Sequence, residues 1–147
     1  MKAGGQRVKG AAFERLIAAD IREHLGLENV RRNLNQYQMA DEGDLIAGPF
    51  VIECKHYKPN GTVWFQKDWW DQVVRAAGED YIPILVFKYD RHPVRAALPL
   101  AALDNSYDPD VVGWEKALSP LVTDWQTALM VMGGILAEEM EDANLRN

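Results

Sequence analysis

The spacing of hydrophobic and polar residues along the chain predicts an α/β domain. Between residues 10 and 25, apolar side chains recur every three to four positions, which is typical of a helix that ends before Gly26. The apolar face of this helix comprises Phe13, Ile17, Ile21 and Leu25. Glu14 falls in the middle of that face, where a carboxylate is costly unless it is paired or binds a metal. A metal-site role fits this position, and so does a structural role in which Glu14 reaches solvent or an arginine.

The remaining pattern predicts several strands and two further helices. The predicted strands are an exposed edge strand at 29–37, a β-hairpin at 44–55, a buried central strand at 81–89 and a returning strand at 94–100. One helix is predicted over residues 64–77. A last helix is predicted from Ser119-Pro120, as N-cap and first helical residue, to about residue 143. Between them, residues 38–43 are expected to form a loop and residues 104–113 a polar linker.

The predicted hairpin concentrates charged side chains. If Gly48-Pro49 is its two-residue loop, Asp44 lies directly opposite Glu53. Side chains alternate across a strand, so Glu53 and Lys55 share one face and Cys54 points to the other. Two adjacent carboxylates repel each other unless a cation lies between them, and a hard divalent ion such as Mg²⁺ meets that need. The alternative is a surface salt-bridge cluster on a solvated hairpin face.

Two other stretches contribute polar or aromatic side chains near this hairpin. Gln72 interrupts the apolar face of the helix predicted over 64–77, whereas Trp69 on that face is expected to pack in the core. Trp64 and Trp70 point elsewhere and could cover a partner or DNA. The edge strand offers phosphate donors and a stacking ring, namely Arg31, Arg32, Asn33, Asn35, Gln36 and Tyr37. A solvated strand face is the open alternative for this set.

Length and composition indicate an ordinary soluble globular protein. The 147 residues suffice for one domain, and 48% apolar and 26% charged residues are typical values. A single cysteine excludes a disulfide framework and a multi-cysteine zinc site, which favours a reducing cytoplasm. The first residues lack the apolar core of a signal peptide. The most apolar segment, residues 128–137, is too short to cross a bilayer, so no membrane association is expected.

The net charge of −6 is unevenly distributed. Residues 1–38 carry a net charge of +3, residues 39–103 of −2 and residues 104–147 of −7. Residues 1–9 are predicted to form a flexible basic arm that includes Lys9, a candidate DNA contact. No strong basic patch is visible, but the acidity lies mainly outside the part with the hairpin, so the overall charge does not exclude a nucleic-acid partner.

The hairpin residues resemble the signature of the PD-(D/E)XK nuclease superfamily. Glu53-Cys54-Lys55 matches the (D/E)-X-K part, and Gly43-Asp44 stands where many members have Pro-Asp. The order helix, strand, hairpin, helix and buried strand is similar to that fold over residues 10 to about 100. Glu14 resembles the helix glutamate that joins the metal site in the Holliday-junction-resolvase branch. The run Trp69-Trp70-Asp71-Gln72 is similar to the helix after the catalytic strand in phage-encoded members, where a glutamine reaches back to the site.

This resemblance implies a restriction-endonuclease-like core, with a mixed central sheet flanked by helices, to which an extra C-terminal helix is added. It implies an endonuclease that depends on Mg²⁺, with Mn²⁺ as substitute, and hydrolyses phosphodiester bonds of branched or four-way DNA. Glu14, Asp44 and Glu53 would hold the metal, with the carbonyl of Cys54 as a further ligand. Lys55 would orient or deprotonate the attacking water or stabilise developing charge, and Gln72 would position Lys55 or the water.

Several alternatives remain open beside this interpretation. The chain could be another nuclease with the same site, such as a nicking, restriction-like or exonuclease enzyme, or a non-catalytic DNA-binding or assembly module. Residues 10–103 are expected to form the nuclease core, and residues 104–147 an acidic linker and helix that belong to the same domain or to a homodimer interface. A phage-encoded protein of this kind would act in the host cytoplasm.

Overall fold

The computed structural model describes residues 3–32, 44–61 and 63–146. Its centre is a six-stranded sheet in which the strands follow chain order from β1 to β6. The strands are β1 (Val30–Arg32), β2 (Asp44–Ala47), β3 (Phe50–Tyr57), β4 (Ile82–Tyr89), β5 (Arg95–Pro99) and β6 (Pro120–Asp124). Neighbouring strands are antiparallel except β3 and β4, which run parallel. The sheet is therefore mixed, as the resemblance implied.

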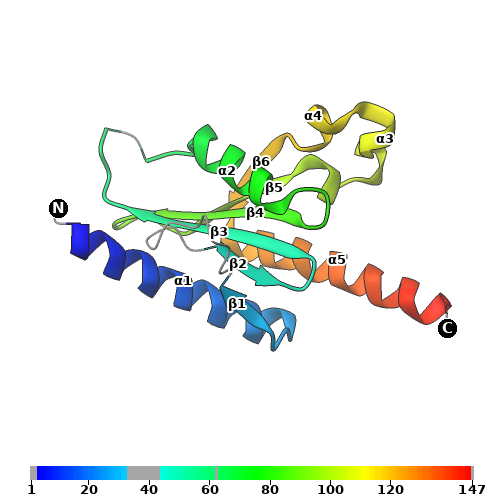
Figure 1. Ribbon diagram of the computed structural model, residues 1–147, viewed down its shortest axis with the longest axis horizontal. Helices are drawn as coiled ribbons and strands as arrows, with labels where there is room; N and C mark the ends of the chain where they lie inside the picture. Colours follow the sequence, from blue (N-terminus) through cyan, green and yellow to red (C-terminus); the bar gives the residue numbers. More distant parts are fainter. Residues whose placement is uncertain (1–2, 33–43, 62, 147) are drawn as a thin grey trace.

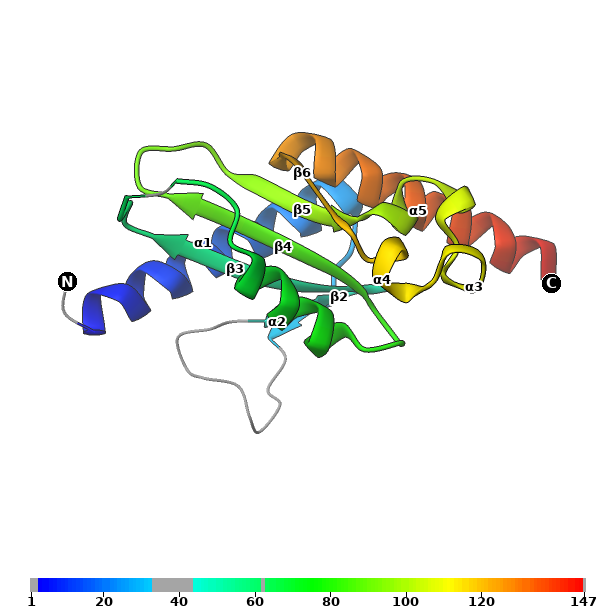
Figure 2. The ribbon, with the colours of Figure 1, turned by 90° about the horizontal axis from the view of Figure 1, so that it is seen from above.

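Helices cover both faces of the sheet. The long helices α1 (Ala3–Leu25) and α5 (Trp125–Arg146) lie on one face, and α2 (Lys67–Ala77), which connects the two parallel strands, lies on the other (Figure 1). The short elements are η1 (Leu100–Ala102), η2 (Asn105–Tyr107), α3 (Pro109–Val112) and α4 (Trp114–Ala117). Seen from above, α2 crosses one face of β3 and β4 while α1 and α5 lie behind the sheet (Figure 2).

The alternation of side chains along β3 divides the core into two clusters. Phe50, Ile52 and Cys54 are buried on the side of α1 and α5, together with Ile17 of α1 and Met132 of α5. Val51 is buried on the opposite side, among residues that include Val73 and Trp70 of α2. By the two-residue period of a strand, Glu53 and Lys55 share the face of Val51. The α2 side of the sheet therefore combines apolar packing with the charged pair.

The predicted edge strand and central strands are confirmed with shifted ends. Among the described strands, β1 pairs only with β2, and it covers three of the residues predicted. Strand β4 is central and almost fully buried, and β5 returns antiparallel beside it. The predicted loop at residues 38–43 and the DNA contacts Asn33, Gln36 and Tyr37 lie outside the described residues. No helix in the part of the chain described by the structure is long and apolar enough to span a membrane.

The N-terminal helix begins earlier than predicted. Helix α1 already includes Ala3, so residues 3–9 are helical rather than part of the predicted basic arm. Lys9 Nζ lies 2.7 Å from Asp90 Oδ2, next to the end of β4. Tertiary contacts of this kind outweigh weak helix propensity. The glycines at positions 4 and 5 therefore misled the prediction of the helix start.

The predicted start of the last helix is also wrong. Residues 120–124 form edge strand β6, in which Pro120 pairs with Pro99 and Leu121 with Leu98. A proline is tolerated on an edge strand because its missing N–H removes no bond between central strands. Helix α5 begins only at Trp125, and Asp124 Oδ1 accepts a hydrogen bond of 3.1 Å from the backbone N–H of Thr127. Asp124, rather than Ser119, thus provides the N-terminal cap.

Two tryptophans that follow the hairpin, Trp70 and Trp64, differ in burial. Trp70, predicted to point away from the core, is buried, and its Nε1 donates a 3.0 Å hydrogen bond to the carbonyl of Leu118. Trp64, in contrast, is half exposed, with the guanidinium of Arg95 4.9 Å from the ring centroid. The prediction for Trp70 is wrong because α2 turns its 70, 73 and 77 positions toward the sheet.

Candidate active site

The β2–β3 hairpin brings the two predicted acidic positions together. Ala47 pairs with Phe50 and Asp44 with Glu53, so the register predicted from a Gly48-Pro49 loop is confirmed. Gly48 has a φ of +54°, which glycine adopts without strain, and a Cβ there would contact Leu27 at 3.4 Å. The side chain of Asp44 lies outside what the structure describes. The backbone nonetheless places positions 44 and 53 directly opposite each other.

Glu53, Lys55 and Gln72 meet on the α2 side of the sheet. Lys55 Nζ lies 3.3 Å from Glu53 Oε1, and Gln72 Nε2 lies 3.5 Å from the same oxygen. Glu53 is fully buried and Lys55 only 3% exposed. The predicted reach of Gln72 back from its helix toward the hairpin is therefore present in the geometry. The catalytic roles assigned to the three residues stay predictions.

The second carboxylate oxygen of Glu53 is a buried polar atom that lacks the hydrogen bond such atoms usually have. Glu53 Oε2 is buried and has no hydrogen-bond partner among the described residues. A buried acceptor without a partner costs roughly 1–3 kcal/mol, and more when it is charged. Protein cores rarely retain such an atom without a reason. A cation at this oxygen would remove the cost, and carboxylate oxygens suit Mg²⁺ and Mn²⁺ rather than soft metals. The residues present thus fit a hard divalent ion, although no group of three acidic, His or Cys side chains that could hold a metal occurs among the described residues.

Residues 5–117 of the chain match a family model described as "Phage putative PDDEXK endonuclease". The chain belongs to this family. No curated protein and no solved structure matches the chain. The matched range ends with α4, so β6 and α5 lie outside it.

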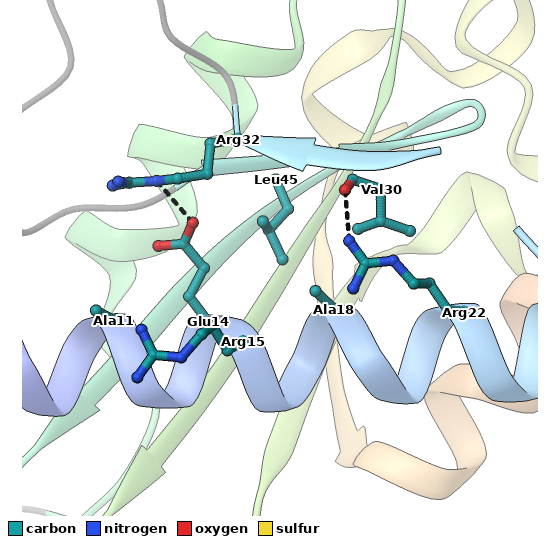
Figure 3. Close-up of a pocket in the computed structure, with 8 residues that line it drawn as sticks. All are labelled: Ala11, Glu14, Arg15, Ala18, Arg22, Val30, Arg32 and Leu45. Carbon is teal, nitrogen blue, oxygen red and sulfur yellow. Dashed lines mark hydrogen bonds and ion pairs between the residues drawn. The ribbon is translucent and has the colours of Figure 1, made fainter. Parts of the chain in front are cut away.

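Glu14 is held on the other side of the sheet from Gln72. Glu14 Oε1 lies 2.9 Å from Arg32 Nε, at the border of a cavity of about 410 Å³ between α1 and the β1–β2 edge (Figure 3). Burial raises the pKa of the Glu14 carboxyl above its ordinary value, and the charge and hydrogen bond of Arg32 offset only part of this effect. The structure therefore joins Glu14 to an arginine, the structural alternative considered from sequence. A role of Glu14 in metal binding stays a prediction.

The other predicted contacts lie on edge strand β1, on helix α1 and in the core cluster beneath that helix. Arg31 and Arg32 belong to edge strand β1 and are exposed, and Arg32 is paired with Glu14. Lys9 is paired with Asp90. Cys54 is buried in the cluster beneath α1 and α5. Metal binding by its carbonyl and DNA binding by the three basic residues stay predictions.

A polar network at the end of β3 was not predicted from the sequence. The carboxylate of Asp90 lies between Lys9 and His56, with His56 Nε2 2.9 Å from Asp90 Oδ1. Burial lowers the pKa of His56, although Asp90 opposes this shift, and the hydrogen bond from Lys9 lowers the pKa of Asp90. The parallel pairing of Tyr57 with Tyr89 brings these residues together. Only the register of β3 and β4 could have indicated this network, because His56 and Asp90 are far apart in sequence.

Proposed function

We propose that this protein is a metal-dependent DNA endonuclease that hydrolyses phosphodiester bonds at the Glu53–Lys55–Gln72 cluster. The observation that carries the proposal is the buried Glu53 Oε2, which has no hydrogen-bond partner among the described residues. The other oxygen of the same carboxylate is engaged by Lys55 and Gln72. A carboxylate with one oxygen fixed and the other left for a cation is a suitable metal ligand. Family membership supports the same interpretation.

Mg²⁺, with Mn²⁺ as substitute, is the ion that this donor set favours. Glu53 would hold it together with Asp44, which the hairpin register places opposite, and the Cys54 carbonyl could complete the set. Glu14 lies on the other side of the sheet from Gln72, so it would join only if its carboxylate left Arg32 and reached the ion from that side. When bound, the ion offsets the charge of the scissile phosphate and makes water a stronger nucleophile.

The roles of the chain's own residues follow from their contacts. Gln72 restrains Glu53 from α2, so that the carboxylate keeps its orientation on the strand. Lys55 supplies a positive charge beside the same carboxylate, where it can stabilise charge that develops on the phosphate or orient the water. Because the two groups are withdrawn from solvent, their electrostatic effects are stronger than they would be at the surface.

The finer parts of the proposal are a preference for branched DNA and a homodimer. Resolving a four-way junction requires two symmetric incisions, and a two-fold dimer with one site per chain is the simplest geometry. Helix α5 extends past the sheet, and it keeps exposed apolar side chains at Met130, Met140 and Leu145. These side chains could belong to such an interface.

A cleavage panel tests the proposal. The protein is incubated with linear, nicked, flapped and four-way DNA, with Mg²⁺, Mn²⁺, Ca²⁺ or EDTA. We expect cleavage with Mg²⁺ or Mn²⁺ and none with EDTA. Glu53→Gln keeps the shape of the side chain but removes its charge, so it should abolish cleavage. Glu115→Gln, on exposed helix α4, should leave cleavage unchanged.

Different results of the panel would select different alternatives. Cleavage of linear DNA as fast as of junctions would favour another nuclease type. DNA binding without cleavage under every metal would favour a non-catalytic module. Sedimentation of the active protein as a monomer, with symmetric junction cleavage retained, would exclude the homodimer.

A further inference from the structure

A second cavity opens beside the proposed site, at the end of β3. It has a volume of about 280 Å³, and its walls include the rings of Tyr57, Trp69 and Tyr89. Tyr57 and Trp69 are stacked, with ring centroids 5.5 Å apart and planes 12° from parallel. Trp69 also contacts Tyr89, with ring centroids 6.0 Å apart. This hollow, here called the chamber, is open to solvent on one side, is partly lined by aromatic residues and has room for a single flat ring system.

The chamber lies along the same strand as the candidate catalytic lysine. Tyr57 follows Lys55 by two residues and shares its face of β3, so their Cα atoms are separated by about 7 Å. That distance is comparable with the step from one nucleotide to the next in an extended strand. A DNA strand whose phosphate lies at Lys55 would therefore bring a neighbouring base to the mouth of the chamber.

The charges at the mouth indicate which part of a nucleotide would enter. Lys58 and Asp68 both line the cavity and both are exposed. The carboxylate of Asp68 disfavours a phosphate inside, whereas Lys58 can bind a phosphate at the rim. Asn60, also in the lining, provides an amide donor and acceptor that suit the edge of a base. Gln66 adds an amide oxygen as acceptor, because its amide nitrogen donates to the Trp64 carbonyl and the Tyr89 hydroxyl. A neutral aromatic ring inside and a phosphate outside satisfy both charges.

We propose that this chamber receives one unpaired nucleobase of the substrate strand, next to the phosphate that is cut. This inference rests on the proposed function, because it takes Lys55 as the position of cleavage. A base within a duplex is stacked and paired and must leave the helix before it can enter such a pocket. The chamber would therefore select DNA with unpaired or displaced nucleotides, which branch points and flaps provide.

The first experiment measures the gain in binding from a single base, in EDTA and hence without cleavage. One oligonucleotide consists entirely of abasic residues, and a second is identical but carries one 2-aminopurine. We expect wild-type protein to bind the second about tenfold more tightly, as one base–aromatic stack provides, and to quench its fluorescence. Tyr57→Ala should lose both the gain and the quenching, while Tyr57→Phe, which keeps the ring, should retain both.

The controls separate a specific pocket from general effects on fold or charge. Trp114→Ala removes another half-exposed tryptophan, on α4, and should leave the gain from the single base unchanged. Circular dichroism melting establishes that Tyr57→Ala is folded. The exposed Lys58→Ala gives a second variant with little risk to the fold, and it should weaken binding of both oligonucleotides while leaving the ratio between them intact.

Two results would overturn the inference. One is a wild-type protein that binds both oligonucleotides equally well. The other is a Tyr57→Ala variant that retains the full gain. The proposed function is judged separately by metal-dependent cleavage. A gain from the base without any cleavage would show that the pocket binds a base, but it would refute the nuclease proposal and with it the position of that base beside a cut phosphate. Cleavage without the gain would refute the pocket and leave the nuclease proposal standing.

Discussion

Lys55 Nζ lies 3.3 Å from Glu53 Oε1, and both side chains are almost completely withdrawn from solvent. A buried charge whose partner is removed keeps its desolvation cost and loses the compensating attraction. The pair is therefore expected to matter for stability as well as for catalysis. This dual role affects which variants can test the site.

The first prediction concerns this buried pair. Lys55→Ala should lower the free energy of unfolding by about 3–5 kcal/mol, because Glu53 would remain buried without its cation. The double variant Glu53→Gln, Lys55→Met should lower the free energy of unfolding by less than Lys55→Ala does, since no buried charge of the pair remains. Urea unfolding at pH 7 measures both. A loss for Lys55→Ala no larger than that for Lys116→Ala, on the short helix α4, would show that Glu53 does not depend on its partner.

The second prediction concerns the binding of metal by Glu53. An ion that binds only the folded state at tenfold above its dissociation constant contributes about 1.4 kcal/mol, which corresponds to a rise in Tm of roughly 3–6 °C. Mg²⁺ and Ca²⁺ should both produce this rise, although only Mg²⁺ should support cleavage. The rise should disappear in Glu53→Gln and persist in Glu115→Gln. An equal rise in both variants would mean that the ion binds elsewhere.

The third prediction follows from the raised pKa of Glu14. Because burial favours the neutral carboxyl in the folded state, the contribution of Glu14 to stability is fully present below its unfolded pKa, about 4.5, and is lost as the pH rises through the higher folded value. Glu14→Gln removes this titration. The free energy of unfolding of the variant, relative to that of wild type, should therefore increase as the pH rises from 4 to 7, as measured by urea unfolding at both pH values.

The activity of the same variant tests the role of Glu14 in the site. If Glu14 leaves Arg32 to bind the metal during catalysis, Glu14→Gln should reduce cleavage strongly. Cleavage at the wild-type rate would make Glu14 a structural residue, and the similarity to the resolvase branch would lose its main support. A relative stability that does not change with pH would contradict the assignment of a raised pKa.

The sequence predicted the parts of the fold that depend on local patterns. The Gly48-Pro49 turn fixed the hairpin register, and a register determines which residues are opposed, so the pairing of Asp44 with Glu53 followed. Gln72 was recognised because it interrupts an apolar face. These signals are short-range and unambiguous.

The features that were missed depend on contacts between distant segments. Whether residues 120–124 continue a helix or join the sheet is decided by β5, which lies more than twenty residues earlier in the chain. The sequence offered both a metal and an arginine as partner of Glu14, and the choice of Arg32 depends on how α1 lies against β1. Neither contact leaves a periodic signal in the sequence, and local propensity gave the wrong start for α5.

The last prediction concerns whether α5 serves the core or an interface. Trp125, Ala128, Leu129 and Met132 are buried against α1 and the sheet, and Trp125 Nε1 donates a 2.9 Å hydrogen bond to Asp20 Oδ2 of α1. This half of α5 is therefore part of the domain core. Truncation after Ser119, which also removes β6, should unfold the protein rather than produce a folded monomer.

Two methionines of α5 provide a matched test, because they lie two residues apart and differ mainly in burial. Met132 is fully buried, whereas Met130 is 76% exposed. Met132→Ala should lower the free energy of unfolding by about 2–5 kcal/mol through the cavity that it leaves. Met130→Ala should change it by less than about 0.5 kcal/mol. If α5 also forms a dimer interface through its exposed side chains, Met130→Ala should weaken dimerisation in sedimentation experiments while stability at low concentration stays unchanged. Equal losses of stability in the two variants would contradict the packing of α5 described above.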